Sequence, residues 1–344
     1  FCFCTVSLHA QQESTQSPIR QVISQVEPYG SIRMGAGFTD EGEAGVTDNA
    51  SRVGFTLKHF ISEESQLAVV GRVEMGLNLV NRDETIEFAP GANPGVTQAG
   101  DAVFARIGYL GVAYKNFQIT FGKQNSVYYT LGAIESVDRL YAFGGVASGV
   151  WNIADGGISG TGRANRAIVL TYKIKGLQLG AQVQARNISE NSTFADSYGF
   201  GANYAFGSFG IGIGYNKVED GVDDPNPNQA ASGDEALVTS ASYEKDRLTV
   251  AASFARMNNH LRTSGIFYNA NGYEFYVGYI FSQDKKWKAA TGYTWIEPDA
   301  DQELGAFDRK FAVLELSYTF KPGGNIFATA QLEQSNEASG EINR

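Results

Sequence analysis

The sequence predicts an all-β protein, a transmembrane antiparallel β-barrel with a long loop folded into its interior. Three observations predict this fold. Apolar and polar residues alternate along many segments of about ten residues, short and long connections alternate between those segments, and no apolar run approaches the roughly 18 residues that a membrane helix needs. The composition agrees, since the 344 residues include 40 Gly, 22 Phe and 17 Tyr and only 19% charged residues.

The alternation separates two faces of each segment. In QLAVVGRVEMGLNL, Val69, Val73 and Leu77 share one parity, while Arg72 and Glu74 occupy the other. A strand places these sets on opposite sides of the sheet. Large charged residues on the polar face suit a water-filled interior better than the core of a soluble sandwich, and aromatic residues at the segment ends suit the two membrane interfaces.

The expected strands share this alternation and end at turn residues. They cover 27–38, 50–60, 66–80, 102–114, 116–123, 164–175, 177–187, 195–206, 208–218, 234–245, 247–257, 269–281, 286–297, 307–320 and 325–335. A closed single-chain barrel of this kind has an even number of strands, so fifteen predict an intact protein of sixteen whose C-terminal closing strand is missing here. The barrel then occupies 27–335, and 336–344 is a truncated last outer loop.

The N-terminus has a different composition. Residues 1–10, FCFCTVSLHA, have the apolar character of the end of a secretory signal, and 11–26 form a polar lead-in. Cys2 and Cys4 are the only cysteines, so the remaining chain can form neither a disulfide nor a thiolate metal site.

Charge and motifs exclude several functions. A formal net charge of -10 argues against nucleic-acid binding. Glycine-rich stretches do not lie between a strand and a helix, and His59 and His260 make no pair at metal spacing, so we expect no cofactor and no metal site. The acidic loop EDGVDDPNPN lacks calcium-loop spacing, although its carboxylates can bridge lipopolysaccharide through divalent cations.

The longest break in the strand pattern, 124–163, is the most informative, because long irregular segments in a compact fold are usually functional. Around it the chain resembles the Gram-negative general diffusion porins. EPYGSIRMG resembles their first strand, ASRVGFTLKH and QLAVVGRVEMGLN the second and third, and FARIGYLGVAYKNFQITFGKQNSVYY the fourth and fifth. SVDRLYAFGG resembles the segment of their third loop that narrows the pore, with Ala142 where the family usually has Glu.

The resemblance implies a pore constriction in which third-loop carboxylates face a row of basic residues on the barrel wall. Its residues in this chain fall into two sets. The expected basic wall consists of Arg52, Arg106 and either Arg163 or Arg166, which match the family's positions, with Arg72, Arg33 and Lys58 on the same lumen-facing parity. The expected loop residues are Asp138, which matches the first acid of the family segment, Arg139 beside it, and Glu135 and Asp155 as substitutes for the missing second acid.

The function implied by this resemblance is passive diffusion of ions and small hydrophilic solutes through the bacterial outer membrane, by a homotrimer surrounded by lipopolysaccharide and other outer-membrane lipids. Opposed charges across a narrow aqueous slot favour small polar solutes and set the ion preference. A substrate-specific porin and a structural or adhesive barrel with a plugged lumen remain alternatives. An outer-membrane hydrolase using His260 and Ser264 is disfavoured because both lie in an expected loop.

Overall fold

The computed structural model describes residues 2–6, 25–38, 44–48, 50–80, 102–136, 139–140, 159–185, 195–222, 232–263, 266–299, 309–321 and 323–333. These residues form one sheet and a short π-helix, η3 (Tyr128–Ala133). None of the helical segments in these ranges is long and apolar enough to cross a membrane. Its strands are β1 (Cys2–Val6), β2 (Val26–Phe38), β3 (Ala44–Asp48), β4 (Arg52–Ser62), β5 (Leu67–Leu77), β6 (Val103–Tyr114), β7 (Phe117–Asn125), β8 (Arg163–Ile174), β9 (Leu177–Gln184), β10 (Ser197–Phe206), β11 (Phe209–Val218), β12 (Glu235–Lys245), β13 (Leu248–Thr263), β14 (Ile266–Ile280), β15 (Trp287–Pro298), β16 (Arg309–Lys321) and β17 (Gly324–Glu333).

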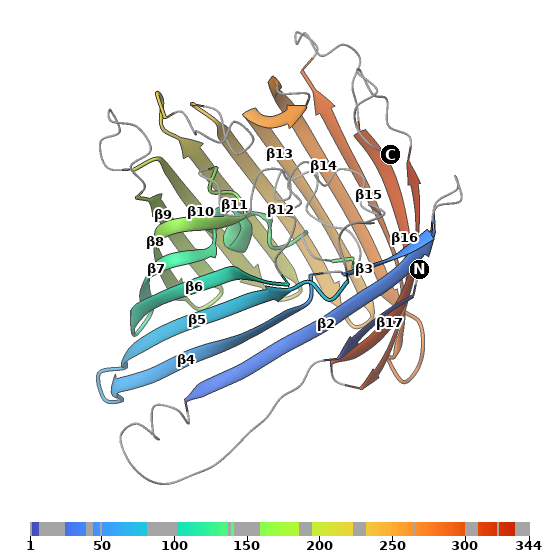
Figure 1. Cartoon of the computed structure of the whole chain (residues 1–344), viewed down its shortest axis with the longest axis horizontal. Helices are drawn as coiled ribbons and strands as arrows, with labels where there is room; N and C mark the ends of the chain where they lie inside the picture. Colours follow the sequence, from blue (N-terminus) through green and yellow to red (C-terminus); the bar gives the residue numbers. More distant parts are fainter. Residues whose placement is uncertain are drawn as a thin grey trace.

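The sheet follows the order of the chain, and every pair of neighbours is antiparallel, as Figure 1 shows from β2 round to β17. The short β3 and the longer β4 pair with successive parts of the same edge of β2. Together they therefore occupy one strand position in the sheet. Strands β2 and β4 to β17 each overlap one of the fifteen expected segments, so the predicted all-β antiparallel architecture is confirmed.

The position between β17 and β2, where the missing closing strand was expected, holds β1. Phe3 pairs with Phe327 on one side and with Gly35 on the other, so the pairings complete a cycle of sixteen positions. Residues 2–6 were expected to belong to the remnant of an export signal. Export of the chain stays a prediction, as do the limits of the polar lead-in.

Tight turns lie where the sequence predicts them, at one end of the sheet. The β6–β7, β10–β11 and β12–β13 connections have two residues each. Lys115 and Asp246 adopt φ values of 51° and 54°, the left-handed conformation that such hairpins require so that the turn matches the strand twist.

Side-chain exposure separates the outer and inner faces of the sheet. On β11, Phe209, Ile211 and Ile213 are exposed, whereas the glycines between them are buried, Gly212 beneath η3 and Gly210 beneath Glu135. Neighbouring outward aromatics contact one another next to the tight turns, as Phe206 and Phe209 do with ring centroids 5.6 Å apart. An apolar outer surface with aromatic bands is typical of a strand barrel that spans a membrane.

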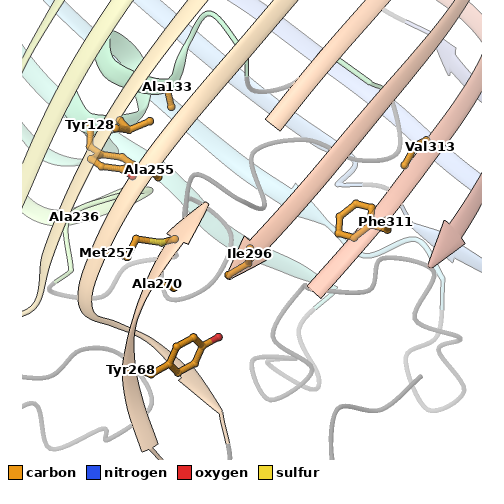
Figure 2. Packing of buried hydrophobic residues seen from close by; sticks show 11 residues of the cluster. Tyr128, Ala133, Ala236, Ala255, Met257, Tyr268, Ala270, Ile296, Phe311 and Val313 are labelled. Atoms are coloured by element: carbon orange, nitrogen blue, oxygen red, sulfur yellow. The ribbon is translucent and has the colours of Figure 1, made fainter. Parts of the chain in front are cut away.

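Part of the inner face is apolar and lies against the third loop. Tyr128 and Ala133 of η3 belong to one buried cluster with inward-facing residues of β12 to β16, which Figure 2 shows spread over these strands. The cluster also contains Ala236, Val238, Ala255, Met257, Tyr268, Ala270, Ile296, Phe311 and Val313. This packing positions the start of the third loop inside the barrel.

Candidate pore constriction

The third loop enters the lumen directly after β7. Ser126 begins the turn, since its hydroxyl accepts a hydrogen bond from the Tyr129 amide at 3.0 Å and its carbonyl accepts one from Thr130 Oγ1 at 2.7 Å. The helix η3 then lies on the inner face of β10, β11 and β12 (Figure 1). Its close approach depends on glycine, because a Cβ on Gly212 would lie 2.6 Å from the Gly132 carbonyl oxygen.

Both ends of the loop are bonded to the wall. Gln182 on β9 accepts a hydrogen bond from the Val127 amide at 3.2 Å and donates one to the Gly160 carbonyl at 3.4 Å. Asn216 on β11 donates to the Ser159 carbonyl, and Ser240 on β12 donates to that of Gly132 at 2.5 Å. The described parts of the loop therefore lie inside the barrel, as predicted.

Glu135 and Arg139 follow η3 and contact the wall on which the helix lies. Asn203 Nδ2 donates to Glu135 Oε1 at 2.8 Å, and the Ser242 hydroxyl donates to Oε2. Arg139 donates from Nε to the Glu135 carbonyl at 3.0 Å and forms an ion pair with Glu244 of β12. Their expected role as pore charges stays a prediction, and the contacts observed here anchor the loop to the wall. Asp138, Ala142 and Asp155 lie outside the described residues.

The basic wall is centred on a carboxylate. Glu74 is 1% exposed, and its two oxygens accept hydrogen bonds from Arg72 Nη2 at 2.7 Å and Arg106 Nε at 2.9 Å. Tyr29 Oη donates to Glu74 Oε2 at 2.9 Å and accepts from Arg72 Nε at 2.6 Å. Arg52 is close enough to act electrostatically on the same carboxylate. The charge-assisted bonds orient both guanidinium groups along the wall.

Strand geometry explains how these residues meet. Val73 is exposed on the outer face, so Arg72 and Glu74 on either side of it point inward. The register between β5 and β6 shifts where Glu74 pairs with Ile107 and Met75 pairs with Ala105. The extra residue at this bulge is Arg106, which is thereby aimed at Glu74, and bulges commonly redirect a side chain in this way.

Arg33 and Lys58 share the inward parity of their strands, as predicted. Ile32 and Met34 are exposed on the outer face of β2, and Arg33 lies between them in sequence. Backbone bonds between Arg33 and the Ser51 side chain tie β2 to the start of β4, where Arg52 Nε donates to the Ala50 carbonyl at 3.2 Å. Lys58 lies 4.9 Å from the Phe60 ring centroid.

The third wall position, expected at Arg163 or Arg166, stays a prediction. Ala164 and Ala167 are the inward-facing residues at this end of β8, where they pack with Val127 of the third loop. The register between β7 and β8 shifts between Gln124 and Gly122, and Arg166 has φ 49° at this bulge. Arg166 is exposed at this bulge, and Arg163, next to Ala164 at the start of β8, is half-buried.

Glu74 and Tyr29 were not among the expected site residues. Glu74 lies two positions after Arg72 and shares its inward parity. This parity is the sequence signal that marks Glu74 as a carboxylate beside the basic wall. Tyr29 carries no such signal, because its contact with β5 depends on the pairing of three strands.

Comparison with known proteins agrees with this architecture. Residues 2–338 match the family described as Gram-negative porin. The chain belongs to the Gram-negative porin family. The curated relatives of this porin include the outer membrane porin protein OmpD of Citrobacter koseri, 27% identical over 250 residues, and that of Salmonella typhimurium, 24% identical over 250 residues. These matches cover 69% of the chain but less than two thirds of either relative. The family and these relatives place the porin in the bacterial outer membrane.

Solved structures share its fold at low sequence identity. The trimer form of Vibrio cholerae OmpT superposes with a TM-score of 0.65 at 16% identity, covering 91% of this chain and 89% of that one. The anion-selective porin from Comamonas acidovorans gives 0.68 at 13% identity, covering 91% and 90%.

Proposed function

We propose that this porin is a water-filled channel for passive diffusion of ions and small hydrophilic solutes, with its constriction between the basic wall and the third loop. The observation that carries the proposal is the joint placement of the Arg72–Glu74–Arg106 cluster and the third loop on the inner face of one sheet. Fixed charges beside a narrow aqueous passage favour small polar solutes and disfavour apolar ones.

The charges of the wall support a preference for anions. Arg33, Arg52, Arg72 and Arg106 carry four positive charges on inward-facing positions, and Glu74 is the acid within their cluster. On the loop, Arg139 offsets the charge of Glu135. The structurally similar Comamonas acidovorans porin is described as anion-selective, which is consistent with this proposal.

We further propose that the porin is a homotrimer in a membrane containing lipopolysaccharide. Its structural relatives include the trimer form of Vibrio cholerae OmpT. Exposed aromatic and aliphatic side chains cover much of its outer face, as contact with lipid or with neighbouring subunits requires.

Bilayer recordings of the purified porin test this function. We expect ohmic conductance without saturation and a reversal potential, under a salt gradient, that indicates anion preference. Arg106→Ser and Arg52→Ser should each shift permeability toward cations. Saturation by one solute would instead indicate a substrate-specific porin, and absence of conductance would indicate a plugged barrel.

A further inference from the structure

We propose that Tyr29 is a positioning residue of the pore, and that Gly54 makes the notch through which Tyr29 reaches the basic wall. The inference rests on the proposed channel function and adds to it a residue that carries no charge. Tyr29 lies on β2, whereas the residues it positions, Arg72 and Glu74, lie on β5, with β4 between the two strands.

The first observation is the double role of the Tyr29 hydroxyl. It accepts a hydrogen bond from Arg72 Nε at 2.6 Å and donates one to Glu74 Oε2 at 2.9 Å. The Arg72 guanidinium also lies over the Tyr29 ring, with its Cζ 4.9 Å from the centroid. A phenol can donate and accept at once, so Tyr29 ties the cation and the anion of the wall together. A phenylalanine would retain the ring contact and lose both bonds.

The second observation concerns β4. Tyr29 pairs with Gly54 across β2 and β4, and Gly54 pairs with Glu74 across β4 and β5, so the three residues form one row. A Cβ on Gly54 would lie 2.6 Å from Tyr29 Cζ and from its hydroxyl oxygen. The tyrosine ring therefore occupies the space above Gly54, and a side chain at that position would push it away from β5.

The third observation is that the Arg72 side chain is partly exposed, so it can move into the lumen if one of its bonds to the wall is removed. Its side chain is 31% exposed, compared with 12% for Arg106 and 1% for Glu74. With Tyr29 in place, Arg72 bonds to the wall through both Nε and Nη2. Without the Tyr29 hydroxyl, Arg72 would keep the second of these two bonds, from Nη2 to Glu74, and lose the first. The guanidinium would then extend further into the lumen while the formal charge of the pore stays the same.

Tyr29→Phe tests the proposal because it removes one oxygen and no charge. We expect the anion-to-cation permeability ratio, measured from reversal potentials in planar bilayers, to rise roughly twofold or more, which is well within the factor of about ten or more by which a hydrogen bond to a charged group shifts an equilibrium. Open-channel current noise should increase as Arg72 moves. Tyr109→Phe is the matched control, since Tyr109 pairs with Arg72 on the next strand and has no hydroxyl bond to the cluster among the described residues.

Two further variants separate positioning from folding and from charge. In an Arg72→Gln background, Tyr29→Phe should have no further effect on the permeability ratio, because Tyr29 acts through Arg72. Gly54→Ala should reproduce the Tyr29→Phe shift, and heat-modifiable migration on gels will show whether each variant is folded.

The outcomes distinguish this inference from the proposed function. If Tyr29→Phe folds and leaves both permeability ratio and noise unchanged while Arg106→Ser shifts the ratio, Tyr29 has no positioning role and the channel proposal stands. An effect of Tyr29→Phe that persists undiminished in the Arg72→Gln background also overturns the proposal. If Arg106→Ser has no effect either, the proposed basic wall itself is wrong.

Discussion

Nδ1 of His260 lies 2.6 Å from Oδ1 of Asp234, and both side chains are buried on the inner side of the sheet. His260 follows a register shift in β13 between Met257 and Leu261, and Asp234 immediately precedes β12. Burial raises the pKa of the Asp234 carboxyl, and the neighbouring His260 opposes that rise. Neither the metal pair with His59 nor the dyad with Ser264, which lies outside the described residues, anticipated this contact.

His260→Leu should lower the free energy of unfolding by about 3 kcal/mol, because removing one member of a buried pair leaves the other without compensation. Urea unfolding of the protein in lipid vesicles, followed by tryptophan fluorescence, measures this loss. Adding Asp234→Asn should recover part of it. His59→Gln, near the β4–β5 turn, should change the free energy by less than about 0.5 kcal/mol. Equal losses for His260→Leu and His59→Gln would refute the structural role of the pair.

Asp299→Asn should reduce stability in a pH-dependent way. Arg256 Nη1 and Nη2 bind the two Asp299 oxygens at 2.6 and 2.5 Å, and these bonds lower the pKa of the Asp299 carboxyl. A lowered pKa gives stability that is present above the pKa of the unfolded chain and is lost as the pH falls through the folded value. The variant should therefore be about 1 kcal/mol less stable at neutral pH, and the difference should vanish in strong acid. A difference that is constant with pH would contradict this.

Glu135→Ala should loosen the third loop, because Asn203, Ser242 and Arg139 all lose their contact with its carboxylate. We expect greater open-channel noise and an altered conductance in single-channel recordings. Ser242→Ala removes one of these contacts and should give a smaller effect in the same direction. Glu297→Ala removes an acid from the outer face of β15 and should leave the current unchanged. Quiet, wild-type currents from Glu135→Ala would show that Glu135 is dispensable as an anchor.

Gly212→Ala should displace η3 from the wall toward the lumen. The added Cβ would lie 2.6 Å from the Gly132 carbonyl oxygen and 2.9 Å from Ser240 Oγ. Overpacking of this kind costs about 1–3 kcal/mol, and we expect lower single-channel conductance as the loop moves inward. Gly108→Ala is the control, since a Cβ there meets no atom within 4 Å. Similar conductance for the two variants would argue against close packing at Gly212.

The parity pattern predicted the inner and outer faces because a strand alternates strictly, and it placed Arg72, Arg52, Arg33 and Lys58 on the correct side. The third wall position, Arg163 or Arg166, was expected from the family resemblance; it lies beside a bulge near the start of β8, which interrupts the alternation and has no reliable signature in a single sequence. Arg106 also lies at a bulge, but its placement agreed with the family motif.

The sequence by itself determined strands β2 and β4 to β17, the tight turns between them and the lumen-facing parity of most strands, because each of these depends on the order of neighbouring residues. Only the tertiary structure decided that Glu74 joins Arg72 and Arg106, that Tyr29 reaches them over Gly54, and that Glu135 and Arg139 bond to β10 and β12. These contacts depend on the register between strands and on the path of the loop across the lumen. Hydrogen bonds and packing between residues distant in sequence set both.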